Sequence, residues 1–259
     1  MAEKFRERAV ILSQEMIAAQ IFSMWLKTEK IAGAAVPGQF ISVYSNDSGR
    51  MLPRPISICE TDKERNAVRI VYRVAGKGTE EFSGYKAGDC LDILGPLGNG
   101  FPAERCPEGK KAFLIGGGIG IPPMVQLSKE IGGEVQVIAG YRDELFLTDE
   151  LSSKGKLYIA TEDGSTGTKG NVLDCIRENG LTADVIYACG PTPMLRAIKT
   201  YAQEQNTECW ISLEERMACG VGACLACVCR SKEVDDHSKV HNKRICKEGP
   251  VFRAEDVEL

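Results

Sequence analysis

Several features that define other protein classes are missing from this sequence. No apolar run approaches the roughly 20 residues of a membrane-spanning helix, so the sequence predicts no membrane partner. The formal net charge is −4, and no stripe of lysine and arginine argues for a nucleic-acid partner. There is no internal repeat and no low-complexity segment. Residues 1–8 lead into a strand-like stretch and lack the apolar core of a signal peptide.

Cysteine, by contrast, is abundant, with 11 residues. Without a secretory signal, this number predicts a cytoplasmic protein whose thiols bind metal or pack in cores. Cys219, Cys224 and Cys227 are separated by four and two residues, and Cys246 follows. This C-x4-C-x2-C…C order is typical of a plant-type [2Fe–2S] cluster. Zinc and simple packing are the alternatives, but zinc sites usually use two separate cysteine knuckles, and here both spacings share Cys224.

Two glycines inside this motif favour a cluster. Gly220 and Gly222 have no Cβ and can adopt positive φ angles, so the loop can wrap closely around a cluster. Backbone N–H groups of such a loop can also point at the sulfur atoms. Cys229 lies two residues after Cys227 and is a fifth candidate ligand, but we expect it to pack.

The remaining cysteines and the histidines are expected to be structural. The sequence predicts small buried hydrophobic residues at Cys59, Cys90, Cys106, Cys175 and Cys209. His237 and His241 lie in a charged stretch, residues 232–243, which predicts a solvated loop between the third and fourth cysteines of the motif. Contact with a partner protein is the alternative for this loop.

The periodicity of the chain changes near residue 110, and we expect a mixed β and α/β protein. Before it, short strands such as 8–12, 19–26 and 68–74 predict an antiparallel β-barrel. After it, short apolar runs alternate with helical stretches and predict a Rossmann-like α/β domain. These runs are 111–116, 135–140, 157–160 and 184–189, with helices at 122–131, 172–179 and 193–204. The expected domains are a barrel at 1–103, an α/β domain at 104–206 and a cluster module at 207–259.

Two motifs of the α/β region predict a dinucleotide site. The first is a glycine string that follows the first strand and opens a helix, so that its N–H groups can approach a pyrophosphate. Alone it is also compatible with a plain tight turn. The second stands at the end of a later strand, where ligands of such sheets bind. The residues concerned are Gly116, Gly117, Gly118, Gly120, Cys189, Gly190, Pro191 and Met194.

A carboxylate motif after the third strand bears on the choice of nucleotide. There the chain reads Thr161-Glu162-Asp163-Gly164. Carboxylates at this edge would repel the 2′-phosphate of NADP and could accept a hydrogen bond from the ribose of NAD. A solvated turn is the alternative. We therefore expect NAD(H), with Glu162 as the discriminating residue.

The barrel region holds Arg54-Pro55-Ile56-Ser57. An arginine beside a conformationally fixed proline can present two parallel donors to a phosphate, and the serine can hydrogen-bond a ring. By itself such a segment is also typical of a surface turn.

In this order the barrel motif, the glycine string and the Cys-Gly-Pro motif resemble the ferredoxin–NADP⁺ reductase superfamily over the whole chain. Segments 95–101, 214–229 and 246–252 narrow the resemblance to the electron transfer subunits of NAD-dependent dihydroorotate dehydrogenase B. In many relatives a tyrosine that stacks on the flavin stands at the position of Ile56. The resemblance implies reactive contacts for Ser57 and Cys189. It implies an FAD site made by Arg54, Pro55, Ile56, Ser57, Val71, Tyr72, Arg73, Gly78 and Thr79.

The resemblance also implies an activity and a partner. Electrons would pass through the [2Fe–2S] cluster and FAD to NAD⁺ in de novo pyrimidine biosynthesis, because a flavin can exchange one or two electrons. Since all 259 residues are assigned, dihydroorotate oxidation would belong to a separate FMN-containing catalytic subunit, in a heterotetramer with two copies of each chain. The alternatives are an NAD(P)H–ferredoxin oxidoreductase or sulfhydrogenase subunit, and a non-catalytic nucleotide-binding electron carrier.

Overall fold

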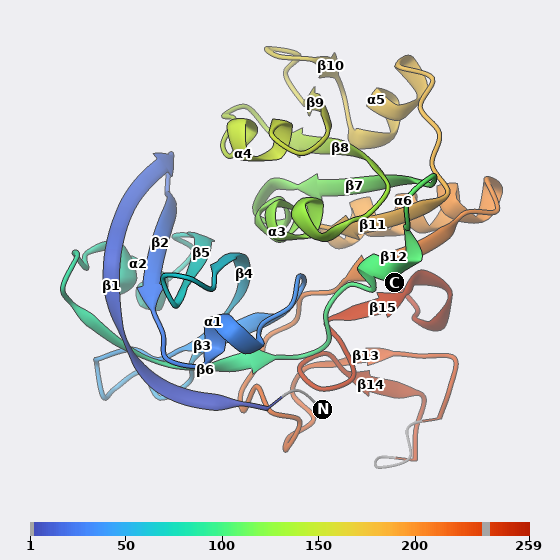
Figure 1. Cartoon of the computed structure of the whole chain (residues 1–259). Coiled ribbons are helices and arrows are strands. Elements are labelled where there is room, and N and C mark those ends of the chain that lie inside the picture. Colours follow the sequence, from blue (N-terminus) through green and yellow to red (C-terminus); the bar gives the residue numbers. More distant parts are fainter. Residues whose placement is uncertain (1–2, 235–238) are drawn as a thin grey trace.

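A computed structural model describes residues 3–234 and 239–259 of the chain. Figure 1 shows a strand barrel, a larger sheet covered by helices, and a small hairpin region next to both. His237, which is predicted to lie in a solvated loop, is outside the described residues. Among the described residues, no helix is both long and apolar enough to cross a lipid bilayer.

Six antiparallel strands close the N-terminal barrel, as the sequence predicts, in the order β1-β2-β5-β4-β3-β6. The strands are β1 (Phe5–Ala18), β2 (Ile21–Lys27), β3 (Phe40–Val43), β4 (Arg54–Asp62), β5 (Ala67–Arg73) and β6 (Cys90–Leu97), with short helices α1 (Ile31–Ala34) and α2 (Lys77–Ser83). Successive side chains of a strand point to opposite faces. In β3, Ile41 therefore belongs to the barrel core, whereas Phe40 packs in a second core outside the barrel.

The second sheet has the order β10-β9-β8-β7-β11-β12-β15 and is parallel except at β15. Its strands are β7 (Lys111–Gly117), β8 (Glu134–Tyr141), β9 (Lys156–Thr161), β10 (Thr168–Lys169), β11 (Val185–Cys189), β12 (Glu208–Ser212) and β15 (Val251–Arg253). The first strand of this region, β7, lies in the centre, between β8 and β11. Chain order therefore reverses at β7 and β11, the position at which open α/β sheets bind nucleotides.

Helices cover both faces of this sheet, and strand β7 shows why. Ala112 and Leu114 pack on one face together with α3 and α4, whereas Phe113 and Ile115 pack on the other face with α5 and α6. The helices are α3 (Pro122–Glu130), α4 (Thr148–Ser152), α5 (Val172–Glu178) and α6 (Thr192–Glu204), with 3₁₀ turns η1 (Ala103–Arg105), η2 (Gly118–Gly120) and η3 (Ala254–Asp256). The continuous apolar sequence of β7 thus reflects burial on both sides, as predicted for parallel strands.

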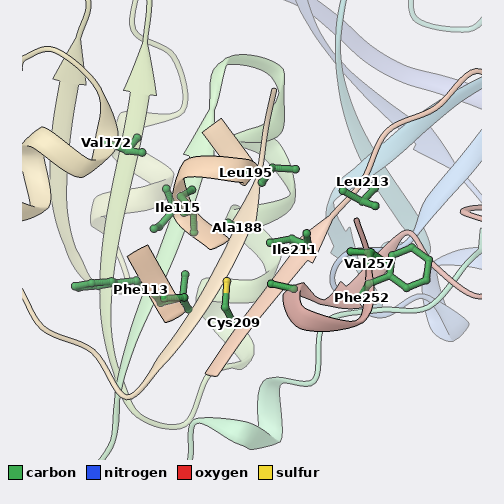
Figure 2. Close-up of a cluster of buried hydrophobic side chains, with 14 of the residues drawn as sticks. Phe113, Ile115, Val172, Ala188, Leu195, Cys209, Ile211, Leu213, Phe252 and Val257 are labelled. Carbon is green, nitrogen blue, oxygen red and sulfur yellow. The ribbon is translucent and has the colours of Figure 1, made fainter. Parts of the chain in front are cut away.

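The C-terminal region is joined to the sheet and to the barrel by one shared core. Its hairpin consists of β13 (Val228–Arg230) and β14 (Asn242–Arg244), whereas β12 and β15, which also follow residue 206, are strands of the large sheet. Figure 2 shows Ile211 and Leu213 beside Phe252 and Val257. Small modules bury too little apolar surface to be stable alone, which explains why the cysteine-rich region shares this core.

Four of the five cysteines expected in cores are buried, namely Cys59, Cys106, Cys175 and Cys209. The prediction for Cys90 is wrong, because this residue is only half-buried. Cys90 is the first residue of β6 and pairs with the partly exposed Val10 of β1 at the rim of the barrel.

Candidate functional site

A cavity of about 1040 Å³ lies between the barrel, the large sheet and the chain segment 212–217. This volume is at the upper end of the roughly 300–1,000 Å³ typical of pockets that hold small molecules and cofactors. All residues predicted to bind FAD except Gly78 line the cavity: Arg54, Pro55, Ile56, Ser57, Val71, Tyr72, Arg73 and Thr79. The structure therefore brings together three segments, β4, β5 and the start of α2, that the sequence joined only by resemblance.

Gly78 contributes by its missing side chain. A Cβ atom at this position would lie 2.6 Å from Nε of Arg54, so only glycine lets the guanidinium lie against the start of α2. Arg54 Nη1 donates to the Leu52 carbonyl over 2.5 Å, which orients the group. The Thr79 hydroxyl accepts from the backbone N–H of Ala75 at 2.9 Å and holds the adjoining turn. The other N–H groups of Arg54 are therefore placed to bind a phosphate.

Replacing Arg54 with alanine is expected to weaken FAD retention by roughly ten- to a hundredfold, because it removes a charged donor worth about 1.5–3 kcal/mol. Equilibrium titration of the cofactor-free protein with FAD measures the effect. Arg65→Ala is the matched control, since Arg65 is an exposed arginine of the same barrel that pairs with Asp62. An FAD affinity of Arg54→Ala equal to that of the control would contradict the role assigned to Arg54.

Two of the predicted flavin residues have side chains in the barrel core. The Tyr72 ring is buried against Phe22, and its hydroxyl donates to Gln14 Oε1 at 2.9 Å. Burial raises the pKa of this phenol far above its usual range. Ile56 packs in the same core. Both side chains thus pack in the barrel core, and both residues also line the cavity.

The two dinucleotide motifs meet at the carboxyl ends of β7 and β11. Gly116 pairs with Cys189, and the backbones of Gly117 and Gly190 are so close that a Cβ on Gly190 would lie 3.2 Å from Gly117 Cα. The Met194 side chain fills the remaining space, because a Cβ on Gly117 would lie 2.5 Å from its sulfur. Gly118 adopts a positive φ of 53°. These glycines let the two backbone segments approach each other more closely than a residue with a side chain would allow.

Cys189 is a buried thiol at this junction. Burial raises its pKa to about 12, so the group is neutral at physiological pH. A neutral buried thiol is a weak nucleophile. Cys189 is therefore suited to packing beside a ligand and not to covalent chemistry.

Glu162 lies at the same edge of the sheet but two strands away from β7. Its backbone N–H bonds the Tyr141 carbonyl, and its side chain is exposed after β9. The neighbouring Asp163 carboxylate accepts hydrogen bonds from the N–H and the hydroxyl of Ser165, which close the local turn. Asp163 thus fits the turn interpretation, while Glu162 remains available for a nucleotide.

We expect the protein to prefer NAD(H) over NADP(H) by at least about tenfold, roughly 1.4 kcal/mol. Steady-state dye reduction with NADH and NADPH measures this ratio, and Glu162→Arg should narrow it because a cation would attract the 2′-phosphate. Glu178→Arg, the same charge reversal at an exposed position in α5, serves as control. Equal kcat/KM values for the two nucleotides in the unmodified protein would contradict this reading of Glu162.

The four motif cysteines form two thiol pairs. Cys219 Sγ and Cys224 Sγ are 3.3 Å apart, and Cys227 hydrogen-bonds Cys246. Within the described part of the chain, no three Cys, His, Asp or Glu side chains converge as a single metal ion would require. Two pairs suit a cluster of two irons, each of which takes two protein thiolates.

The backbone around these thiols favours negatively charged sulfur. Gly222 N–H donates to Cys246 Sγ at 3.1 Å, and Cys224 N–H donates to Cys219 Sγ at 3.4 Å. Burial raises the pKa of Cys219, but the N–H groups around it dominate and lower the value to about 7. Within the second pair, the thiol–thiol hydrogen bond lowers the pKa of Cys227 and raises that of Cys246, so one of these two thiols ionises before the other. The residues present therefore fit an iron–sulfur cluster, whose sulfurs need such donors.

Gly220 and Gly222 have the positive φ angles that the sequence predicts, 67° and 80°. Cys229, in contrast, packs in β13, and its thiol lies 3.5 Å from the Lys243 carbonyl. Burial raises the pKa of Cys229 to about 11. Its surroundings thus favour a neutral thiol, as expected for a residue that does not bind metal.

Sequence reasoning missed Arg244, which holds the cysteine loop (residues 219–227) in place. Its Nη1 donates to the Gly222 carbonyl at 3.0 Å, while Nε and Nη2 bind the two oxygens of Glu248 at 3.0 and 2.6 Å. The buried guanidinium therefore links the loop that holds three cysteines to the turn after the fourth. An Arg-x-x-x-Glu spacing next to Cys246 is the sequence signal that marks this pair.

Sequence reasoning also missed the segment that joins the cavity to the cysteines. Residues 212–217 leave the end of β12, line the cavity and reach Cys219 two residues later. Glu214 lines the cavity. The protein atoms around this cavity partly desolvate its carboxyl group and raise its pKa. Its position directly after a strand at the carboxyl edge of the sheet is the signal that could have identified it.

Two protein families match separate parts of the chain. The oxidoreductase FAD-binding domain matches residues 9–101, and the iron-sulfur cluster binding domain of dihydroorotate dehydrogenase B matches residues 214–258. The electron transfer subunit of dihydroorotate dehydrogenase B (NAD(+)) from Bacillus caldolyticus is 42% identical, with 98% of this chain and 99% of that protein covered. The corresponding subunit from Listeria monocytogenes is 44% identical, with 96% and 97% covered.

Solved structures have the same architecture. The NADH-dependent reduced ferredoxin-NADP oxidoreductase, described for flavin-based electron bifurcation, superimposes with a TM-score of 0.85 at 30% identity. The superposition covers 97% of this chain and 90% of that one. A ferredoxin NADP⁺ reductase from Neisseria gonorrhoeae, at 16% identity, has a TM-score of 0.65 over 77% of this chain and 91% of that one, and shares the fold alone.

Proposed function

This chain belongs to the family of electron transfer subunits of dihydroorotate dehydrogenase B (NAD(+)), and we propose that it carries electrons from a partner subunit to NAD⁺ in pyrimidine biosynthesis. The observation that carries this proposal is the single segment 212–217, which lines the cavity and continues directly into the cysteine loop. The proposed flavin site therefore adjoins the cysteine loop, and Ile119, within the glycine string, lines the same cavity. Such an arrangement suits electron transfer between cofactors that exchange one and two electrons.

Each site residue has a proposed role in binding or orientation. Arg54, with Gly78 beneath it, binds a phosphate of FAD, and Ser57 and Arg73 line the ring end of the cavity. The glycines of η2 and the Cys189–Met194 segment hold the nicotinamide nucleotide. Bound FAD supplies the conversion between hydride transfer and single-electron transfer. The chain itself orients the reactants and excludes water, which is the usual contribution of a protein to cofactor chemistry.

The proposed cluster ligands are Cys219, Cys224, Cys227 and Cys246, and the N–H groups of the loop offset the negative charge of the sulfurs. The three proposed domains are 1–103, 104–206 and 207–259. The proposed third domain depends on the second for its core, because β12 and β15 are strands of the nucleotide-binding sheet.

The partner is proposed to be an FMN-containing subunit that oxidises dihydroorotate, in a cytoplasmic complex with two copies of each chain. Support comes from the cysteine loop, where Leu225 is 51% exposed next to Cys224. The loop therefore lies at the surface, where a redox centre of a partner can approach the proposed cluster.

Co-expression with a candidate FMN-containing catalytic subunit tests the proposal. The expected result is one complex that contains FMN, FAD and a [2Fe–2S] signal, and that reduces NAD⁺ with dihydroorotate. The reductase-like structure at 30% identity makes an NAD(P)H–ferredoxin oxidoreductase the competing function. Activity with ferredoxin, together with no dihydroorotate-dependent NAD⁺ reduction in the complex, would support the competing function and refute the first.

A further inference from the structure

Ser42 has an unsatisfied hydroxyl group in the interior of the protein. The residue is 1% exposed, and its Oγ atom is the one buried side-chain nitrogen or oxygen without a hydrogen-bond partner in the described part of the chain. A buried hydroxyl without a partner costs about 1–3 kcal/mol, so native proteins rarely retain one. The Ser42 hydroxyl therefore indicates that a hydrogen-bonding group binds next to it.

The hydroxyl faces the cysteine loop. Ser42 lies on β3 two residues after Phe40, so both side chains leave the barrel on its outer face. Phe40 packs in the core that contains Cys227 and Cys246. A Cβ atom on Gly220 would lie 2.8 Å from Ser42 Oγ. Ser42 thus touches the residue that directly follows the first proposed ligand, Cys219.

Flavin is not the missing partner. Phe40 lines the large cavity, but Ser42 is not among the residues of its wall. Leu97, on the neighbouring strand, packs against the same side of Gly220 and has no polar side-chain atom. The loop that contains Gly220 also holds Cys219. The sulfur atoms at this loop are therefore the candidate acceptors for the Ser42 hydroxyl.

We propose that the Ser42 hydroxyl donates a hydrogen bond to a sulfur atom of the iron–sulfur cluster and raises its reduction potential. This inference rests on the proposed function, because it requires the cluster. Reduction adds one negative charge, which spreads over the sulfurs, and a donor stabilises the more negative state more strongly. The barrel that holds FAD would thereby also tune the cluster, through a residue distant from all four ligands in the sequence.

The test is the midpoint potential of the cluster in Ser42→Ala, followed by electron paramagnetic resonance in the complete protein. The expected result is a full cluster whose equilibrium constant for one-electron reduction falls about tenfold, which is roughly 59 mV toward negative potential. Ser231→Ala is the matched control. Ser231 is buried in the same C-terminal region, but its hydroxyl already donates to the Glu233 carbonyl at 2.7 Å.

A second measurement covers the case in which Ser42→Ala loses its cluster. In cluster-free protein, removal of an unsatisfied hydroxyl should leave the thermal midpoint unchanged or raise it, whereas Ser231→Ala should lower it. A full cluster in Ser42→Ala at the potential of the unmodified protein would overturn the inference, as would a lower thermal midpoint of the cluster-free variant. Absence of any cluster from the unmodified protein would instead refute the proposed function.

Discussion

Replacing Cys246 with serine is expected to abolish the electron paramagnetic resonance signal of the reduced cluster. Cys246 forms a thiol pair with Cys227 and accepts a hydrogen bond from Gly222 N–H, so its loss removes one of two thiolates for one iron. The same result is expected for Cys219→Ser, Cys224→Ser and Cys227→Ser. Iron content and the spectrum of each purified variant provide the measurement.

Cys229→Ser is the control for this series. Cys229 is two residues from Cys227 but packs with its thiol near the Lys243 carbonyl. This variant should keep the full signal. FAD should remain at least in part in all five variants, because the barrel that forms most of its cavity is intact. A full signal in Cys246→Ser would disprove the ligand assignment.

Arg244→Ala is expected to lower the free energy of unfolding by about 3 kcal/mol and to deplete iron relative to FAD. Breaking a buried ion pair typically costs about 3–5 kcal/mol, because the partner charge is left uncompensated. The side chain of Arg244 is 5% exposed and that of Glu248 is 25% exposed, which places the expected cost at the lower end. The Gly222 carbonyl also loses its donor. Denaturant unfolding and the iron-to-FAD ratio measure both effects.

Arg230→Ala is the matched control, since Arg230 is an exposed arginine on the neighbouring strand β13. Arg244→Lys should recover only part of the stability, because an ammonium group cannot bind both carboxylate oxygens of Glu248 and the Gly222 carbonyl with the geometry of a guanidinium. If Arg244→Ala retains as much iron per FAD as Arg230→Ala, the bracing role is wrong.

Local sequence patterns predicted several barrel strands, the central strands of the large sheet and its longer helices. Period-two alternation predicted barrel strands, and short apolar runs predicted the parallel strands, because burial on one or two faces leaves a direct record in the sequence. The glycines at 220 and 222 were predicted from spacing alone, since a tight loop requires positive φ wherever it turns. Family membership followed from motif order, and the relatives confirm it.

Contacts between distant segments left weaker signals. Asn99 donates from its backbone N–H to the Gly249 carbonyl at 2.6 Å and from its side chain to the Glu248 carbonyl at 2.7 Å. The segments around these residues, 95–101 and 246–252, both contributed to the resemblance, but nothing in the sequence indicated that they touch. Their contact fixes the turn after Cys246 against the barrel.

The sequence by itself determined which residues are candidates for the chemistry: four spaced cysteines proposed to hold a cluster, an arginine motif proposed to bind a phosphate and two glycine-containing motifs proposed to bind a nucleotide. Only the tertiary structure decided that the arginine motif, Ile119 of the glycine string and the segment before the cysteines line one cavity, that β12 and β15 complete the second sheet, and that Ser42 lies under the cysteine loop. The physical reason is that spacing and periodicity record the local backbone and its buried faces. Packing of barrel, sheet and loop joins residues more than a hundred positions apart, and no local pattern encodes such contacts.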